Sequence, residues 1–406
     1  MHSFITAFAN KQIITTNNSF NTLVMRTKLF ILCTLCVVIF MFNACEEPIS
    51  SNKYEDKTNL WPAAEPTGEK VGYINEKGEM VIPAQYKKAY FFSGGMAKVV
   101  TFENQIQFIN TKGEVVHTLP ENLYCDDYFI NGYIRYYQYM WDRVPPAGLW
   151  DANFNDVIPF GFLRVGNMSK EGLVATGVGY FNKNGERVLT FNADTFDIYN
   201  GIIYDYGDFR DGAAVIHLQC NKNGFSYGRA GAINTKGEWA VDTIYTDLKS
   251  VGGGLIAYMD TTGLWGLLDT QGNKVTEPVF DEVGAYEDGD LLPVRNRMWG
   301  YADNTGTIRI EQQYAYCDPF HEGVAWVTPD RNNYSLIDTS GKVLINLERG
   351  VWPVTACHNG LLAIADYINH VNKYIDKNNN VIYTWDAKDG HGFYPVLLPP
   401  SNRNNN

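Results

Sequence analysis

The amino-acid sequence predicts an all-β protein built from about eight three-stranded repeats of about 35 residues each. Three observations lead to this prediction. An alternating apolar stretch that ends in Asn or Asp, with Gly three residues later, recurs along the chain. A second Gly-containing turn lies midway between its copies. The 406 residues include 37 Gly and 26 Tyr, and this composition favours strands joined by tight turns over long helices.

The first pattern recurs through most of the chain. Its clearest copies are "VGYINEKGEMVIP" (71–83), "AGAINTKGEWAV" (230–241), "WGLLDTQGNKV" (265–275) and "WGYADNTGTIR" (299–309). In the second half of the chain the turn glycines of consecutive copies stand 34 to 35 residues apart, at Gly237, Gly272, Gly306 and Gly341. A fixed period of this length is typical of repeat architectures.

Each copy contains the residues of a tight turn. Asn or Asp at the first corner and Gly at the fourth are typical of a type I turn, and a Gly with positive φ lets the next strand fold back as a hairpin. The last copy has Asn379 at the Gly position, and Asn tolerates this conformation. The third copy has Phe154 there, so we expect a rebuilt or wider turn. The expected first-corner residues are Asn75, Asn110, Asn182, Asn234, Asp269, Asp303 and Asp338.

The second turn is followed by another alternating strand, as in "FRDGAAVI" (209–216) and "FHEGVAWV" (320–327), which gives three strands in each repeat. The span from Gly185 to Gly237 is longer by about half a repeat, which predicts an insertion. The units could close into a β-propeller-like ring, which protects strand edges. They could also stack as an open β-solenoid, in which each unit contacts only its neighbours. We favour the ring, with a ninth, partial copy that completes the first or caps an open end.

The pairs Trp265-Gly266 and Trp299-Gly300 give the sequence a resemblance to the WG-repeat family. The resemblance covers residues 70–386, although most copies carry Val, Ala or Tyr at the Trp position. It implies an all-β repeat domain that is widespread in bacteria. It implies no settled activity and supplies no catalytic motif.

The N-terminal part is predicted to be a targeting signal. Residues 25–44 contain Arg26 and Lys28, followed by a mostly apolar run that is shorter than the roughly 20 residues of a membrane span but typical of a secretory signal. Together with Cys45 this segment resembles the signal peptide of a bacterial lipoprotein. The resemblance implies lipid attachment at Cys45 and a cell-envelope protein anchored to the outer membrane, with surface exposure as an option.

The remaining boundaries follow from composition. Residues 1–24 are expected to be an upstream extension, 45–69 a polar tether, 70–386 the repeat domain and 387–406 a disordered tail. Outside the signal the chain has four widely spaced cysteines, and both disulfide pairing and separate buried thiols remain open for them. They are Cys125, Cys220, Cys317 and Cys357.

Motifs of catalytic, metal and cofactor sites are not found in the sequence. The stretch 376–387 superficially resembles a calcium loop, but Val381 and Ala387 stand where Gly and Glu are required. His321 and His358 lie near cysteines, without the spacing of a zinc site. We therefore predict no catalytic residue, no cofactor and no metal site.

The formal net charge of −12 and the absence of a Lys/Arg cluster argue against a nucleic-acid partner. Trp265 and Trp299 are candidates for an aromatic binding surface, although a Trp repeated at one strand position more often packs in the core. We expect a non-enzymatic binding or scaffolding lipoprotein that presents its repeats to a protein, peptide or glycan. The alternative is a secreted glycan hydrolase, whose carboxylates in 206–212 and 287–290 would gather with aromatic residues in a deep pocket at one end of the ring.

Overall fold

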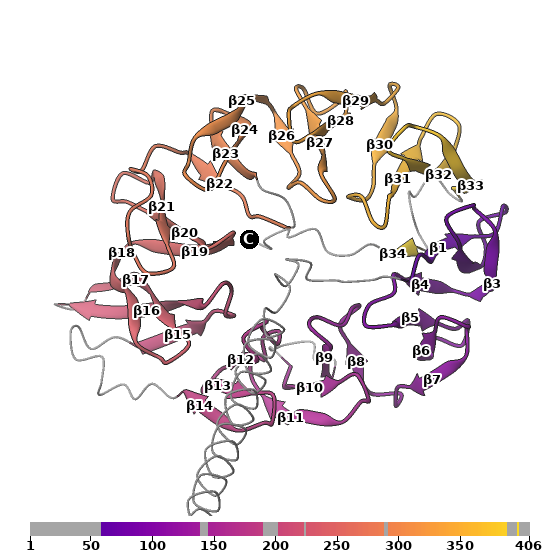
Figure 1. Ribbon diagram of the computed structural model, residues 1–406. Coiled ribbons are helices and arrows are strands. Elements are labelled where there is room, and N and C mark those ends of the chain that lie inside the picture. The colour runs from indigo at the N-terminus through magenta and orange to yellow at the C-terminus, as the bar shows by residue number, and fades with distance from the viewer. Residues whose placement is uncertain are drawn as a thin grey trace, which may run out of the picture. The chain divides into compact units, whose positions relative to one another are not determined.

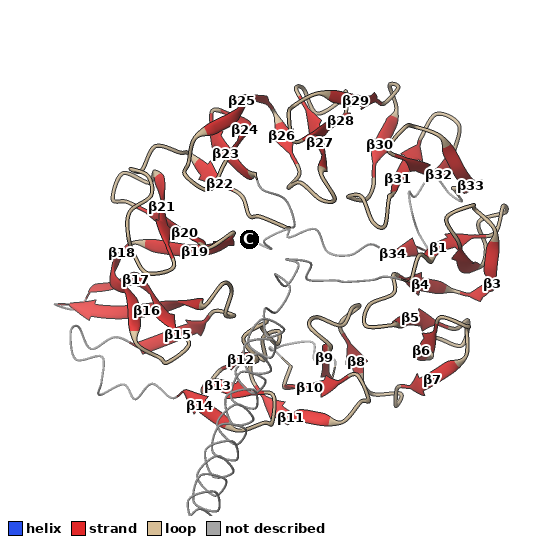
Figure 2. Cartoon of the chain, viewed as in Figure 1, coloured by secondary structure: helices blue, strands red, loops and turns tan. Residues whose placement is uncertain are grey.

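Nine small sheets form a ring, a β-propeller, in the computed structural model (Figure 1). The structure describes residues 58–138, 145–189, 202–222, 225–287, 291–387 and 396–397. Within these ranges all regular secondary structure is strand, as Figure 2 shows, and no helix that could cross a membrane occurs there. The expected all-β ring is confirmed and the open solenoid is wrong. The expected count of about eight repeats is also wrong, because the ninth copy forms a sheet of its own. Three strands per repeat is wrong for most of the ring, since in the described structure three sheets have three strands, five have four and one has five.

The chain builds the sheets in order around the ring, and we number them 1 to 9. Sheet 1 contains β1 (Trp61–Ala64), β2 (Val71–Ile74) and β3 (Met80–Tyr86). Sheet 2 contains β4 (Lys88–Tyr90), β5 (Met96–Val100), β6 (Ile106–Asn110), β7 (Val115–Thr118) and β34 (Val396–Leu397). Sheet 3 contains β8 (Tyr124–Cys125), β9 (Tyr133–Tyr137), β10 (Ala147–Asp151) and β11 (Asp156–Phe162). Sheet 4 contains β12 (Leu173–Thr176), β13 (Gly179–Asn182) and β14 (Arg187–Leu189).

The second half of the ring follows the same plan. Sheet 5 contains β15 (Ile202–Tyr206), β16 (Ala213–Lys222), β17 (Phe225–Asn234) and β18 (Trp239–Tyr245). Sheet 6 contains β19 (Asp247–Gly252), β20 (Leu255–Met259) and β21 (Trp265–Asp269). Sheet 7 contains β22 (Glu282–Val283), β23 (Leu292–Asn296), β24 (Met298–Ala302) and β25 (Ile308–Tyr314). Sheet 8 contains β26 (Tyr316–Cys317), β27 (Val324–Thr328), β28 (Ser335–Asp338) and β29 (Val343–Asn346). Sheet 9 contains β30 (Val351–Pro353), β31 (Leu361–Asp366), β32 (Val371–Asp376) and β33 (Val381–Asp386).

The recurring turn has the same hydrogen bonds in every sheet. In sheet 1 the Oδ1 atom of Asn75 accepts hydrogen bonds from the backbone N–H groups of Lys77 and Glu79, each at 3.0 Å. The N–H of Gly78 donates to the carbonyl of Asn75. This side chain therefore satisfies backbone donors that the turn leaves unpaired. The first-corner residues of the other turns are Asn110, Asp151, Asn182, Asn234, Asp269, Asp303, Asp338 and Asp376.

The turn at Phe154 is not rebuilt, contrary to the sequence prediction. Phe154 adopts the positive φ of 62° that glycine has elsewhere, and Asp151 makes the usual hydrogen bonds. The Phe154 ring stacks on His117 at 3.8 Å between centroids, and it also contacts Trp150. These aromatic contacts offset the backbone strain of a bulky residue at positive φ. Asn379 has φ of 66°, as expected from its tolerance of this conformation.

The predicted insertion between Gly185 and Gly237 lies partly in sheet 5. Strands β16 and β17 have ten residues each and pair along their whole described length, from Ala213 opposite Asn234 to Lys222 opposite Phe225. Most corresponding strands elsewhere have four to six residues. The hairpin therefore carries part of the extra length, while residues 190–201 lie outside the described structure.

Sheets 9 and 1 close the ring. The hydroxyl of Tyr374 in β32 donates to the carbonyl of Pro62 in β1 at 2.8 Å, and Trp61 Nε1 donates to the carbonyl of His358 at 2.8 Å. Both aromatic side chains are buried in a core that sheets 1, 2 and 9 share. Three other tyrosines at the same pattern position donate to the following sheet in the same way: Tyr73 to Tyr90, Tyr180 to Gly207 and Tyr301 to Asp318.

Two predicted boundaries differ from the structure. Strand β1 lies inside 45–69, which was expected to be a tether, and Trp61 in that strand is fully buried. The short strand β34 lies inside 387–406, which was expected to be a disordered tail, and it pairs in parallel with β4. Both strands are short and lie among prolines and polar residues, so the sequence did not indicate them. Residues 1–24, 25–44 and Cys45 lie outside the described residues.

Candidate functional site

The turn carboxylates and the repeat tryptophans lie at opposite ends of the strands. In sheet 6 Leu255 pairs with Asp269, the first corner of the turn, whereas Met259 pairs with Trp265. Trp265 and Asp269 are four positions apart along β21, which corresponds to about 13 Å. We call these two ends of each sheet the turn end and the Trp end. The acidic turns and the tryptophans therefore do not converge, although the hydrolase alternative requires that they do.

Trp265 and Trp299 occupy the same position in neighbouring sheets. Both are half-buried, and each packs against the buried core beside it. Lys249 Nζ lies 4.5 Å from the ring centroid of Trp265, and Arg295 Cζ lies 5.6 Å from that of Trp299. A cation over an aromatic face stabilises both partners. The structure thus gives these two rings packing and cation contacts, and their use as a binding surface stays a prediction.

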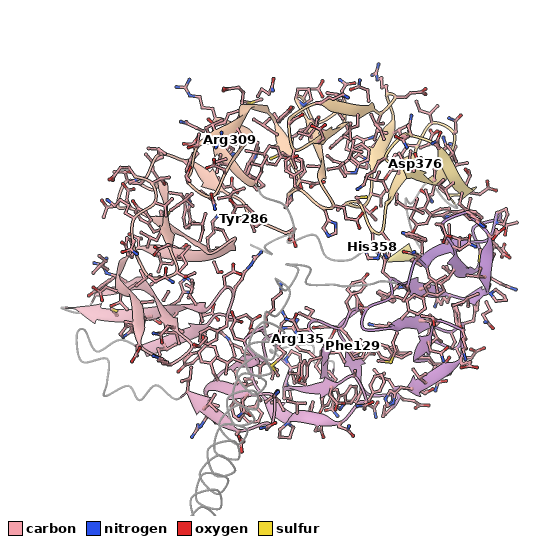
Figure 3. All side chains as sticks on the ribbon, viewed as in Figure 1. Phe129, Arg135, Tyr286, Arg309, His358 and Asp376 are labelled. Carbon is pink, nitrogen blue, oxygen red and sulfur yellow. The ribbon has the colours of Figure 1, made fainter. Side chains whose placement is uncertain are left out.

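The turn carboxylates form hydrogen bonds within their own turns. Thr305 donates from its hydroxyl to Asp303 at 2.6 Å, and this bond, with backbone N–H groups and Arg309, lowers the pKa of Asp303 to about 2. Although partial burial opposes ionisation, hydrogen bonds from Asn380 and backbone groups lower the pKa of Asp376 below its ordinary value. Figure 3 places Arg309 and Asp376 on the outer part of the ring. Carboxylates that stay ionised in this way are poor general acids near neutral pH.

Carboxylates of the second turns fasten neighbouring sheets together. Glu171 accepts a hydrogen bond from the N–H of Gly212 at 2.6 Å, Asp211 accepts one from Gly254 at 3.1 Å, and Glu322 accepts one from Gly360 at 2.9 Å. Each bond joins one sheet to the next. In the stretch 206–212, which was considered for acid/base chemistry, Asp211 thus has a structural contact, and residues 288–290 of the other stretch lie outside the described structure.

Seven residues of the described structure share one position at the Trp end of the innermost strands, and we call them the rim residues. In sheet 6 the rim residue is Asp247, which stands opposite Met259. Each other rim residue stands opposite the residue that corresponds to Met259 in the strand register of its own sheet. The register alone relates them, because no sequence motif does. They are Lys88, Tyr124, Asp205, Asp247, Glu282, Tyr316 and Trp352.

The rim residues of sheets 5, 6 and 7 are acidic and paired with cations. His217 Nε2 lies 2.9 Å from Asp247 Oδ1, and its Nδ1 lies 3.8 Å from Asp205 Oδ2. The hydrogen bond with Asp247 raises the pKa of His217 despite its partial burial. Glu282 Oε2 accepts from Arg295 at 2.8 Å. This sector links neighbouring strands and sheets through ion pairs.

The rim residues of sheets 3, 8 and 9 are exposed aromatics. The exposed fractions of Tyr124, Tyr316 and Trp352 are 42%, 43% and 39%. Trp352 contacts Tyr334, with 5.3 Å between ring centroids, and Tyr367, with 6.5 Å between centroids. Sequence reasoning missed Trp352 because it lies outside the Trp-Gly pattern. The sequence feature that would have indicated Trp352 is an aromatic residue before the second turn, which Tyr124 and Tyr316 share.

The remaining candidates from the sequence have structural surroundings. All four cysteines outside the signal are free and buried, so the disulfide option is not realised. Among the described residues no cluster of His, Cys, Asp and Glu could hold a metal ion. His358, on the inner side of the ring in Figure 3, packs edge-on against Phe91, and Cys357 Sγ lies 3.2 Å from Glu322 Oε2.

Comparison with known proteins shows a family and a fold. Residues 72–101, 231–260, 265–297 and 299–328 match the family model described as "WG containing repeat". None of the curated proteins matches the chain. A crystal structure described as "the eukaryotic initiation factor" is 13% identical, with a TM-score of 0.57, and the match covers 80% of this chain and 96% of that one. This likeness shows the fold alone.

Two bacterial structures match over a similar length with lower scores. Apo AztD from Citrobacter koseri is 12% identical, with a TM-score of 0.38, over 81% of this chain and 94% of its own. BamB from Moraxella catarrhalis is 10% identical, with a TM-score of 0.27, over 82% of this chain and 89% of its own. At these scores neither supports an argument about function.

Proposed function

We propose, from the premise that this chain is a WG-repeat protein with a β-propeller fold, that it is a non-enzymatic binding or scaffolding lipoprotein of the cell envelope. Its ring presents the Trp ends of nine sheets to a protein, a peptide or a glycan. The premise and the fold fit a binding or scaffolding role in general. The anchor, the location and the partner class are parts of the proposal.

The separation of acidic turns from aromatic residues carries this proposal. The turn carboxylates bond to their own backbone and lie about 13 Å along the strand from the repeat tryptophans. A glycan hydrolase needs two carboxylates beside the sugar that its aromatic residues hold. A binding protein needs only a rigid surface whose residues vary from repeat to repeat, and the Trp ends supply one.

The envelope location rests on the sequence before the ring. Residues 25–44 have the n-region and apolar segment of a secretory signal, and Cys45 follows. A lipid at Cys45 would hold the ring near a membrane, where a binding protein meets envelope components. Mass spectrometry of the protein from native membranes tests this, beside a Cys45→Ala variant. A lipidated peptide that starts at Cys45 and disappears with membrane retention in the variant supports the anchor, and an unmodified chain cleaved elsewhere overturns it.

An assay for hydrolysis tests the non-enzymatic part. The purified full chain is incubated with a panel of polysaccharides, and reducing ends are measured over a day. The matched variants are Asp247→Asn and Asp205→Asn, because these two carboxylates flank His217 at the Trp end. We expect no release above buffer. Release that either variant abolishes would support the hydrolase alternative and overturn the proposal.

A further inference from the structure

We propose that four residues of sheets 8 and 9 form a binding site for a neutral oligosaccharide. They are Tyr334, Trp352, Tyr367 and Ile368, and we call them the aromatic platform. The two sheets adjoin in the ring, in the orange to yellow part of Figure 1. This inference rests on the binding role proposed above and specifies its ligand class and its residues.

The platform is an exposed corner of aromatic rings. The Trp352 ring is tilted by 45° to Tyr334 and stands at 85° to Tyr367. The exposed fractions are 39% for Trp352, 47% for Tyr367 and 65% for Ile368. A buried aromatic side chain covers about 150–250 Å², so these exposed parts together offer a few hundred Å². A stable protein interface needs about 800 Å² per partner, so the platform suits a small ligand better than a protein.

The loops that carry the platform are fixed by their own side chains. Asp330 accepts hydrogen bonds from the N–H and the side-chain amide of Asn333, at 2.8 and 2.6 Å, directly before Tyr334. Asp366 accepts from the N–H and the side-chain amide of Asn369, at 3.0 and 2.8 Å, across Tyr367 and Ile368. A surface that is ordered before binding loses little conformational entropy when the ligand arrives.

The segment between the two sheets is fastened to the same loops. The N–H of Tyr367 donates to the carbonyl of Gly350 at 3.0 Å, and the N–H of Leu347 donates to the carbonyl of Tyr334 at 2.9 Å. Gly350 has no side chain, and a Cβ atom there would lie 2.6 Å from Ile368. The close approach of Ile368 to this backbone joins the two sides of the platform.

Polar side chains frame the platform on both sides. Arg331 and Asn332 are exposed in the loop before Tyr334, and Asn369 and His370 are exposed after Tyr367. A sugar ring has apolar C–H faces, which pack on aromatic rings, and a rim of hydroxyl groups that pair with such donors and acceptors. A purely apolar ligand would remove water from these groups without replacing its hydrogen bonds. The net charge of −12 disfavours an anionic ligand, so a neutral sugar fits best.

The ring supplies a matched control at Tyr124. It occupies the same rim position as Trp352 and has a similar exposed fraction, 42%. Its ring stacks nearly parallel on Tyr137, with 6.3 Å between centroids and 18° between planes, whereas Trp352 contacts the rings of Tyr334 and Tyr367 at steep angles. Removal of Tyr124 therefore takes away a comparable exposed aromatic residue from another part of the ring.

Calorimetric titration of the full chain in detergent with cellohexaose and with chitohexaose tests the proposal. We expect saturable binding of at least one of the two. Trp352→Ala should weaken it by about tenfold or more, which is 1.4 kcal/mol, because the central ring of the platform is lost. Tyr124→Ala should leave the affinity within about twofold. More than half of each side chain is buried, so both variants should lose a similar amount of stability, which urea unfolding checks.

Two results would overturn the oligosaccharide site. One is the absence of saturable binding of both hexasaccharides at millimolar concentration. The other is an equal loss of affinity in the two variants. Neither result affects the proposed binding role for a protein or peptide. Release of reducing ends that Asp247→Asn or Asp205→Asn abolishes would instead overturn the non-enzymatic role, so the two failures are distinct.

Discussion

Ring closure predicts a specific cost for the variant Tyr374→Phe. The Tyr374 ring is 1% exposed, and its hydroxyl donates to the Pro62 carbonyl across the junction of sheets 9 and 1. Phe keeps the ring and removes the donor, so the carbonyl loses its partner inside the protein. Leaving a buried acceptor unsatisfied costs about 1–3 kcal/mol of unfolding free energy. Because the hydroxyl is small and the ring remains, we expect about 2 kcal/mol.

The matched variant is Tyr301→Phe, which removes the same bond between sheets 7 and 8. Tyr301 is also fully buried, and its hydroxyl donates to the Asp318 carbonyl at 2.7 Å. In a closed ring both junctions are packed and both hydroxyls are buried, so both variants should be destabilised by similar amounts. Tyr367→Phe, at an exposed position, should change stability by less than about 0.5 kcal/mol.

Urea unfolding followed by tryptophan fluorescence measures these differences, with the slope of the transition as a check that all proteins unfold the same surface. A closed ring predicts losses of similar size for Tyr374→Phe and Tyr301→Phe. A wild-type midpoint for Tyr374→Phe, together with a lowered midpoint for Tyr301→Phe, would mean that sheets 9 and 1 do not pack in solution. That result would refute the closed ring.

Three further predictions concern single contacts. Phe154→Gly relieves the strained backbone but removes the ring stacked on His117. Thermal unfolding should show a net loss of about 1–2 kcal/mol of stability, and a gain of stability would contradict the packing argument. Asp269→Asn places the new amide opposite that of Asn273 and should lower the urea midpoint. Adding Asn273→Glu should restore the midpoint, because four other turns pair Asn with Glu. The raised pKa of His217 means that its ion pairs contribute fully below the unfolded value of 6.5 and are lost as pH rises through the folded value. The stability difference between wild type and His217→Gln should therefore shrink from pH 5.5 to pH 8.5, and a constant difference would contradict it.

The repeat could be predicted from the sequence because its turns are local. Asn or Asp accepts hydrogen bonds from residues two and four positions later, so one short pattern contains all the participants. The same locality explains the error at Phe154. The sequence indicates that Phe is unfavourable at positive φ, but the partner that stabilises it, His117, stands 37 residues earlier in the chain. Contacts between sheets have no sequence spacing that would reveal them.

The count and the limits of the ring were beyond sequence reasoning for a related reason. The ninth copy lacks both the Trp-Gly pair and the turn glycine, and the pairing of β30 to β33 in the structure identifies it as a full sheet. Strand β1 has the sequence "WPAA", which has no alternation, because sheets on both sides bury all four residues. The exposed Trp352 was missed because its strand has three residues and no repeat signature.

The division between turn end and Trp end also indicates where this scaffold can vary. At the turn end each first-corner residue supplies hydrogen bonds that its own backbone needs, so a substitution there costs stability in every sheet. At the Trp end the equivalent rim position holds an acid paired with His217 in sheet 5, a tyrosine in sheet 8 and a tryptophan in sheet 9. The strands accept all three because the backbone bonds of the ladder do not involve these side chains. A ring of this kind can therefore change what its Trp end recognises while its turn end keeps the fold, and this is why we place the ligand on the aromatic platform.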